Sequence, residues 1–206
     1  MQAITDLIMH FQKGGLVMWP LLACSIAVIA IAIERFIYYK SVDSGAAFAS
    51  RYCAAVRSGD FAVATELARK GSGQCAQMLA DVAAIAGGKE EKSAFLESRA
   101  GIFMATLRDK LDYLGIIVTM SPLLGLLGTI VGMIGAFSIF NVEAGAPMAI
   151  TGGIGEALIA TATGLCVAIF SLCAHSYFAH RMDNIITDME QCFSALLEAE
   201  TRRGRS

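Results

Sequence analysis

The sequence predicts an all-α integral membrane protein with three transmembrane helices that are extended by cytoplasmic helices. Three long segments contain no Asp, Glu, Lys or Arg: residues 14–33, 113–142 and 157–180. A helix needs about 20 apolar residues to cross about 30 Å of hydrocarbon, so each segment is long enough to span a bilayer. The composition agrees, because the chain is 56% hydrophobic and only 17% charged.

The distribution of basic residues predicts the orientation in the membrane. Eleven of the 16 Lys and Arg residues lie between residues 34 and 112, and four follow residue 180. None lies between residues 141 and 156. Short loops rich in Lys and Arg stay on the cytoplasmic side, so we expect the N-terminus outside and the C-terminus inside.

Glycines and apolar spacing divide the rest of the chain. Breakers at 71–73 and 87–88 separate stretches of mixed small apolar and charged residues, which are typical of short helices. The expected order is an outer-surface amphipathic helix (1–13), transmembrane helix 1 (14–38), a cytoplasmic helical domain (39–112), transmembrane helix 2 (113–142), a short periplasmic hairpin (143–150), transmembrane helix 3 (151–180) and a cytoplasmic C-terminal helix and tail (181–206).

Two of these helices are expected to continue out of the membrane. No proline follows Lys89 before the second span, and no breaker stands at Arg181 after the third. The tail carries an apolar stripe of Met182, Ile185, Ile186, Met189, Phe193, Leu196 and Leu197. We expect the stripe to pack on the other cytoplasmic helices, with recognition of a target as the alternative.

Small residues predict that the second and third spans pack closely, because membrane helices associate through such faces. Half of the 20 glycines lie within 113–165. One face of the second span combines Ser121, Gly125, Gly128, Gly132 and Gly135, and the third span offers Gly152, Gly153, Gly155, Ala160, Ala162 and Gly164. A tight hairpin with no further function would explain all of these residues.

Glu156 is the only charged residue between Glu143 and Arg181. A carboxylate in the middle of a membrane helix costs roughly 2.5–3.5 kcal/mol, so such residues usually face a protein interior or a hydrated path. Proline suits a first helical turn, and a helix that starts near Pro147 places Glu156 about 13 Å inside it. A start further along would instead leave Glu156 at the interface, where the helix dipole favours it.

Threonines accompany this carboxylate. Thr129 lies beside the glycine face of the second span, and Thr161 and Thr163 follow Glu156. Thr163 shares the Glu156 side of the helix, whereas Thr161 points about 140° away. Each hydroxyl alone is explained by a bond to its own helix backbone. Taken with the single acid, the three predict a polar lining for a proton pathway.

No enzyme motif is present. We therefore expect no catalytic residues, no cofactor and no bound metal. The three histidines have no ligand spacing, no phosphate-binding loop occurs, and the six cysteines include no C-x-x-C pair. We expect these cysteines to be reduced and buried. Nucleic-acid binding is excluded as well, because ten acidic residues accompany the eleven basic ones in the 34–112 segment.

Three motifs carry a resemblance to a known family. The opening Gly14-Gly-Leu-Val-Met-Trp-Pro20 with Ile33-Glu34-Arg35, the segment Pro122-Leu-Leu-Gly-Leu-Leu-Gly-Thr129-Ile-Val-Gly-Met133, and the segment Gly155-Glu156-Ala-Leu-Ile-Ala-Thr161-Ala-Thr-Gly164 resemble the three spans of the MotA/TolQ/ExbB proton-channel family. The opening is most similar to ExbB. The chain departs from the family at Phe170, where a proline is frequent, so a kink in the third helix is not expected to be shared.

The resemblance implies a homopentamer in the bacterial inner membrane, arranged as a ring around a central pore. The pore would hold an ExbD-like single-span partner with an intramembrane Asp, and a TonB-like energy transducer would take up the work. The family glutamate corresponds to Glu156, and its pore threonines correspond to Thr129 and Thr161.

We therefore predict a channel-forming subunit of a motor that is driven by the proton motive force and energises TonB-dependent transport across the outer membrane. One alternative is a TolQ-like subunit for envelope integrity. Others are a membrane scaffold without proton flux, in which Glu156 is interfacial, and a component of a solute transporter.

Overall fold

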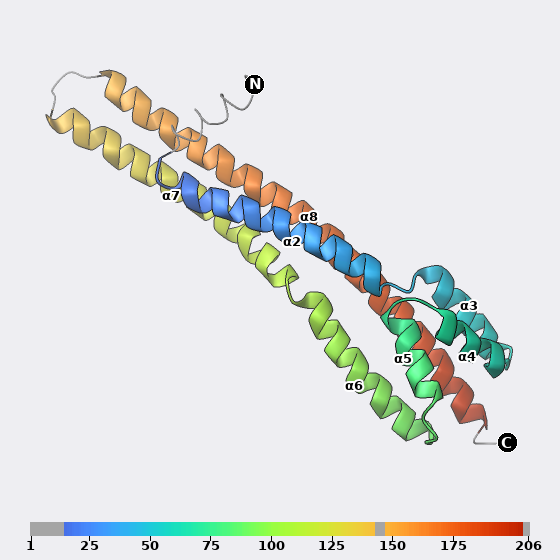
Figure 1. Ribbon diagram of the computed structural model, residues 1–206. Helices are drawn as coiled ribbons and strands as arrows, with labels where there is room; N and C mark the ends of the chain where they lie inside the picture. The colour runs from blue at the N-terminus through green and yellow to red at the C-terminus, as the bar shows by residue number, and fades with distance from the viewer. Residues whose placement is uncertain (1–14, 143–146, 204–206) are drawn as a thin grey trace. The chain divides into compact units, whose positions relative to one another are not determined.

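The computed structural model describes residues 15–142 and 147–203, and these residues form helices joined by short turns (Figure 1). The predicted surface helix at 1–13 and part of the predicted hairpin at 143–150 lie outside them. The helices are α2 (Met18–Val42), α3 (Ala46–Arg57), α4 (Phe61–Lys70), α5 (Gln74–Ala83), α6 (Lys89–Arg108), α7 (Leu111–Val142) and α8 (Pro147–Arg203). The all-α class is thus confirmed for the described residues.

Three helical stretches are long and apolar enough to cross a membrane, as the charge-free segments predict. Each contains an 18-residue window of mean hydropathy between 2.0 and 2.2, within Met18–Arg57, Lys89–Ser138 and Thr151–Arg203. Only 22–33% of each window is buried inside the chain. Most of the apolar surface is therefore free to contact lipid or other membrane helices.

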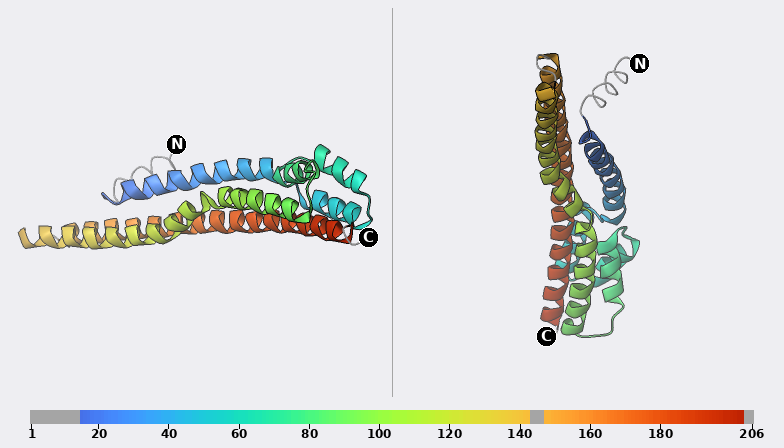
Figure 2. Two further views of the ribbon diagram at one scale, coloured as in Figure 1. Left: turned by 90° about the horizontal axis from the view of Figure 1, so that it is seen from below. Right: turned by 90° about the vertical axis from the view of Figure 1, so that its left-hand side faces the viewer.

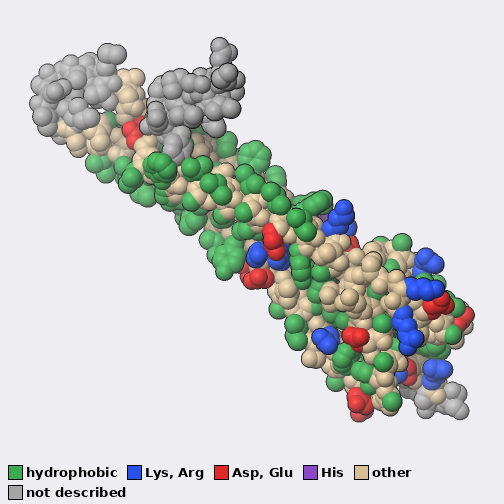
Figure 3. All heavy atoms as spheres, in the orientation of Figure 1, with side chains coloured by type: hydrophobic (Ala, Val, Ile, Leu, Met, Phe, Trp, Pro, Cys, Tyr) green, Lys and Arg blue, Asp and Glu red, His purple; other side chains and the backbone are tan. Residues whose placement is uncertain are grey.

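The chain divides into two compact units, which we call the apolar unit (Met1–Ile33 and Asp112–Ser176) and the polar unit (Glu34–Leu111 and Tyr177–Ser206). The visible face of the apolar unit is covered by hydrophobic side chains, whereas Lys, Arg, Asp and Glu gather over the polar unit (Figure 3). The units therefore correspond to the charge-poor and charge-rich parts of the sequence.

In the apolar unit, α7 and the first part of α8 run side by side (Figure 2). Glycine makes this packing possible: a Cβ added at Gly128 would lie 2.5 Å from Cβ of Ala160, and one at Gly164 would lie 2.6 Å from the backbone oxygen of Ser121. Pro122 lies inside α7 without ending it. The backbones of α7 and α8 thus approach closely at these glycines.

In the polar unit, α3, α4 and α5 are short helices with defined ends. The Asp60 carboxylate accepts a hydrogen bond from the Val63 backbone N–H at 3.1 Å and caps α4. Gly73, with a φ of 89°, is the N-cap residue that precedes α5 and lies close to Ser44. The buried core joins these helices to α6 and the end of α8 through Ala49, Tyr52, Cys53, Leu79, Val82, Leu96, Met189 and Cys192.

The apolar stripe of the tail packs into this core. Met182, Ile185, Met189, Phe193 and Leu196 are all buried. α8 continues without interruption from Pro147 through Phe170 and Arg181 to Arg203, so the third span and the tail form one helix, as expected. It begins within the 143–150 segment that the sequence assigned to a hairpin.

The expected continuous helix from Lys89 into the second span is wrong. α6 ends at Arg108 and α7 begins at Leu111, with Asp109 and Lys110 between them. The backbone carbonyls of Thr106 and Leu107 accept hydrogen bonds from the side chains of Arg35 and Tyr39. The donors of these two hydrogen bonds lie about 70 positions earlier in the sequence, so no local sequence pattern predicts the bonds.

Candidate functional site

Glu156 lies well inside a helix. Because α8 begins at Pro147, the residue stands nine positions along, about 13 Å from the start of the helix. Its side chain is half-buried in the apolar unit. Of the two helix starts considered from the sequence, the structure has the one near Pro147, which places Glu156 inside the helix and not in its first turn.

The carboxyl of Glu156 lies against Gly15, at the entry to α2. A Cβ added at Gly15 would collide with Oε1 of Glu156 and would lie 3.0 Å from its carboxyl carbon. Gly15 also has a φ of 70°, which side chains rarely allow. Glycine is thus required here for two reasons, and the absence of its side chain leaves the space that the carboxyl occupies.

The residues that follow Glu156 in α8 pack closely against α7. A Cβ at Gly132 would lie 3.2 Å from Cβ of Ala157, the residue that follows Glu156. One at Gly125 would lie 3.1 Å from Cα of Thr161. Ala157 and Ala160 are almost fully buried. Glu156 therefore lies at the edge of a closely packed helix pair.

The three threonines differ in their hydrogen bonds. The Thr161 hydroxyl donates to the Gly125 backbone oxygen at 3.1 Å and so bridges α8 to α7. The Thr129 hydroxyl donates to Leu126 at 2.6 Å, and that of Thr163 to Ile159 at 2.8 Å, both within their own helices. Thr129 and Thr163 therefore bond their own helix backbone, as threonines in membrane helices often do. Thr161 differs, because it bonds the backbone of a second helix.

Not all the predicted packing glycines contact another helix of this chain. Gly125, Gly128, Gly132 and Gly164 lie in the α7–α8 contact. A Cβ added at Gly135 or Gly155 would meet no atom within 4 Å in the part of the chain that the structure describes. These two positions leave small-residue surfaces that are open to another chain or to lipid.

Sequence reasoning missed a polar contact between the same helices. Ser171 is fully buried, and its hydroxyl donates to the Leu114 backbone oxygen at 3.0 Å. Ser121, placed on the glycine face by its spacing, is also fully buried, and its hydroxyl has no partner among the described residues. Both serines lie in apolar segments and are spaced by whole helical turns from the glycines. This pattern could have identified Ser121 and Ser171 as buried residues between the helices.

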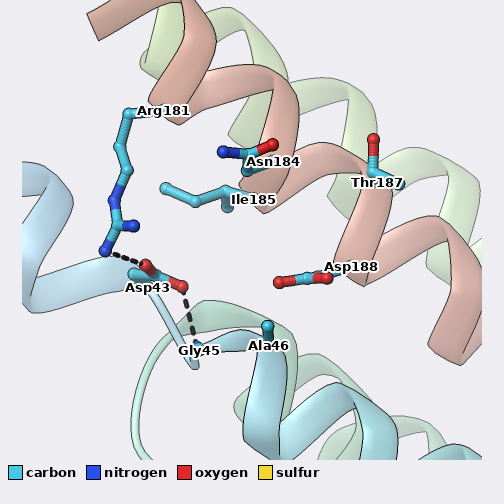
Figure 4. A pocket seen from close by; sticks show the side chains of 8 residues that line it. All are labelled: Asp43, Gly45, Ala46, Arg181, Asn184, Ile185, Thr187 and Asp188. Carbon is cyan, nitrogen blue, oxygen red and sulfur yellow. Dashed lines mark hydrogen bonds and ion pairs between the residues drawn. The ribbon is translucent and has the colours of Figure 1, made fainter. Parts of the chain in front are cut away.

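A second polar feature lies in the polar unit, where a hollow of about 410 Å³ opens between the start of α3 and α8 (Figure 4). The Asp43 carboxylate accepts a hydrogen bond from the Gly45 backbone N–H at 2.7 Å and forms an ion pair with Arg181 at 2.6 Å. Asp188 faces the same hollow, where burial and the nearby Asp43 carboxylate raise its pKa. The described residues include no group of three or more His, Cys, Asp or Glu side chains arranged to hold a metal.

The six cysteines carry free thiols. Four are buried, but Cys166 and Cys173 are exposed, which corrects the prediction that all six are buried. Burial raises the pKa of Cys53 to about 11, and the thiol of Cys75 and burial raise that of Cys192. Thiols with raised pKa values are poor nucleophiles and poor metal ligands at neutral pH. These two cysteines therefore act as small apolar core residues.

Comparison with known proteins gives a consistent family. The sequence profile of the MotA/TolQ/ExbB proton channel family matches residues 68–191. An ExbB-like biopolymer transport protein of Synechocystis sp. is 34% identical over 171 residues, which cover 79% of this chain and 66% of that protein. A second such protein of the same organism is 31% identical, covering 78% of this chain and 79% of its own length.

A TolQ protein also matches, over a shorter range. The Tol-Pal system protein TolQ of Haemophilus influenzae is 33% identical over 84 residues, which cover 40% of this chain and 37% of that protein. The chain spans slightly less than two thirds of the length of the first Synechocystis relative.

Proposed function

The chain belongs to the MotA/TolQ/ExbB proton channel family, and we propose that it is the channel-forming subunit of a motor driven by the proton motive force. The motor would lie in the bacterial inner membrane, with the N-terminus outside and the C-terminus in the cytoplasm. It would energise transport across the outer membrane in the manner of ExbB.

One observation supports this function above the others. Glu156 is the sole acidic residue of its span, lies about two and a half turns inside α8, and is half-buried against Gly15. A carboxylate is costly in an otherwise apolar span, so such a residue usually faces a protein interior or a hydrated path and takes part in function. Glu156 would relay protons or tune their passage.

Thr161 and its neighbours would shape the path. The Thr161 hydroxyl already bridges α7 and α8, so it would hold the two pore helices in register. Thr129 and Thr163 are half-buried, and their hydroxyl oxygens keep a lone pair for water or a partner side chain. We propose these three as the polar lining, with no catalytic residue and no bound cofactor.

The chain needs partners for this role, because one carboxyl does not form a complete path. The open small-residue positions Gly135 and Gly155 would allow another membrane helix to approach closely. We propose a ring of copies, with five expected, around an ExbD-like single-span protein that contributes an intramembrane Asp. A charge that crosses a potential of 100 mV releases about 2.3 kcal/mol, which a TonB-like transducer would receive.

The test is proton uptake by vesicles that contain the complete complex and a pH-sensitive dye. We expect Glu156→Gln to abolish uptake, because the amide cannot carry the proton, and Glu156→Ala to abolish energised transport in cells while the protein stays in the membrane. Glu198→Gln is the control, since Glu198 is exposed in the polar unit. Normal uptake by Glu156→Gln would refute the proposal.

A TolQ-like role is the second candidate, and the similarity to a TolQ protein favours considering it. The two roles differ in the phenotype of a deletion. Loss of energised uptake with an intact envelope supports the ExbB-like role, whereas leakage of periplasmic proteins with normal uptake supports the TolQ-like role. A scaffold without proton flux predicts that Glu156→Gln has neither effect.

A further inference from the structure

Arg35 is the one charged residue that is buried in the part of the chain the structure describes, with 3% of its surface exposed. It follows the first charge-free segment by two positions. Burial of a guanidinium is unfavourable unless its donors are paired and its charge is balanced. The function proposed for Glu156 does not explain this arginine, so its contacts are informative.

The donors of Arg35 are divided between a carboxylate and the backbone of another helix. Nε and Nη2 donate to the two oxygens of Glu34, at 2.7 and 2.9 Å, in a bidentate pair. Nη1 donates to the Thr106 backbone oxygen at 3.1 Å. The guanidinium also lies over the Tyr38 ring, 4.7 Å from its centroid. The Glu34 carboxylate thus orients the Arg35 guanidinium so that its remaining Nη1 group points toward α6.

Tyr39 makes the adjoining contact. Its hydroxyl donates to the Leu107 backbone oxygen at 2.8 Å in a buried hydrogen bond, and only 2% of the residue is exposed. Its ring packs edge-on against Phe178 at 5.7 Å, which fixes the position of the hydroxyl. Arg35 and Tyr39 therefore reach two consecutive carbonyls from one face of α2.

These two carbonyls lie in the last turn of α6, where backbone oxygens have no partner within the helix. Helix ends are usually completed by nearby residues or by water. Here α2 completes the end of α6. In addition, the Lys110 ammonium, inside the break between α6 and α7, lies 3.4 Å from Glu34. α2 is therefore bonded at two points to the end of α6 and at a third to the break that follows it.

We propose that Glu34, Arg35 and Tyr39 form a clamp that holds the α6–α7 break closed, so that this break is a joint controlled by α2. Release of the clamp exposes the carbonyls of Thr106 and Leu107 to water and lets α6 and α7 change direction independently. The mechanical use of the joint, to pass motion from membrane helices to cytoplasmic helices, rests on the proposed function. The clamp itself does not.

Hydrogen exchange of the full-length protein in lipid nanodiscs tests the clamp. Tyr39→Phe keeps the ring and removes the hydroxyl bond. We expect amides between Leu107 and Tyr113 to exchange about five- to tenfold faster, because one buried hydrogen bond that holds the break is lost. Unchanged exchange at these amides, or an equal increase throughout the polar unit, would overturn the clamp.

Tyr38→Phe is the matched control. It keeps the ring beneath the Arg35 guanidinium and changes a neighbouring tyrosine whose hydroxyl makes no bond to α6 among the described residues. We expect it to exchange like the wild type. Arg35→Lys keeps the charge but not the fork, so it should raise exchange less than Arg35→Gln does. Equal increases from both arginine variants would contradict a role for the charge.

The coupling role has its own measurement in the assembled complex. Tyr39→Phe should leave proton uptake at the wild-type level while energised transport falls several-fold. An equal loss of both would show that Tyr39 only supports the fold, and would overturn the coupling role. If wild-type vesicles move no protons, the proposed function and the coupling role fail together, and the exchange experiment still decides the clamp.

Discussion

The hydroxyl of Thr161 donates a hydrogen bond to the backbone oxygen of Gly125, 3.1 Å away and 36 positions earlier in the sequence. Gly125 makes the bond possible, since a Cβ there would lie 3.1 Å from Cα of Thr161. The two residues thus combine a close backbone approach with a polar contact. Five positions separate Thr161 from Glu156, so a change in this contact alters the helix that carries the carboxyl.

Thr161→Val tests this contact, because valine keeps the shape and removes the hydroxyl. Hydrogen bonds between membrane helices contribute about 0.6 kcal/mol on average, so we expect a loss of stability of about that size. Thr163→Val should cost less, since that hydroxyl bonds only its own helix. Unfolding in lipid nanodiscs measures both. A larger cost for Thr163→Val would contradict the importance of the bridge.

Gly164 should tolerate no side chain. A Cβ there would lie 2.6 Å from the Ser121 backbone oxygen and 3.0 Å from Cα of Gly125. Neither atom belongs to a flexible side chain, so we expect Gly164→Ala to separate α7 from α8 at a cost of about 1–3 kcal/mol.

The control for Gly164 is Gly101→Ala, in α6. A Cβ at Gly101 meets no described atom within 4 Å, and alanine favours a helix over glycine. This variant should be unchanged or slightly more stable in the same unfolding measurement. If Gly164→Ala were as stable as Gly101→Ala, the close contact of α7 and α8 would be wrong.

Local and periodic features of the fold were predictable from the sequence. Charge-free length predicts the spans, and Pro147 marks the helix start that places Glu156 inside α8. Glycine spacing predicts the α7–α8 contact at Gly125, Gly128, Gly132 and Gly164, but not that Gly135 and Gly155 lie outside it. Each of these depends on residues within a few helical turns. Their physical causes, apolar length and small side-chain volume, are properties of the residue types themselves.

The contacts that involve distant residues were not predictable. Nothing between Lys89 and Lys110 marks a helix break, because the bonds that replace the helix bonds come from Arg35 and Tyr39. Likewise, the sequence around Glu156 does not show that Gly15 lies against its carboxyl. The choice of Thr161, and not Thr163, as the bridge depends on how close the second helix comes.

Asp188 gives a prediction about pH. Burial and the Asp43 carboxylate raise its pKa in the folded protein, so the folded state holds this proton more tightly than the unfolded state does. Stability should therefore rise as pH falls through the raised pKa towards the ordinary value for aspartate. Arg181 faces the same hollow and opposes this shift.

Asp188→Asn isolates that contribution. The variant should be more stable than the wild type at neutral pH, and the difference should shrink as the pH is lowered towards the ordinary pKa of aspartate. Thermal unfolding of both proteins across that range provides the measurement. Asp183→Asn, at an exposed position on the same helix, should show no such convergence. A stability difference that does not vary with pH would contradict the raised pKa.

Gly15→Ala should disturb the proton pathway more than it disturbs the fold. The new Cβ would take the place of the Glu156 carboxyl oxygen, so the carboxyl must turn away. Alanine at a φ of 70° also costs about 1–2 kcal/mol. Gly59→Ala is a matched control, because Gly59 has a φ of 79° and a Cβ there would meet nothing within 4 Å.

Both variants therefore incur the same backbone penalty, and only Gly15→Ala displaces the carboxyl. We expect similar losses of stability but a loss of proton uptake of tenfold or more in Gly15→Ala alone, measured in vesicles that contain the complete complex. Equal uptake by the two variants would mean that the carboxyl does not need its place beside Gly15. Uptake would then have to depend on a position of Glu156 that another chain provides.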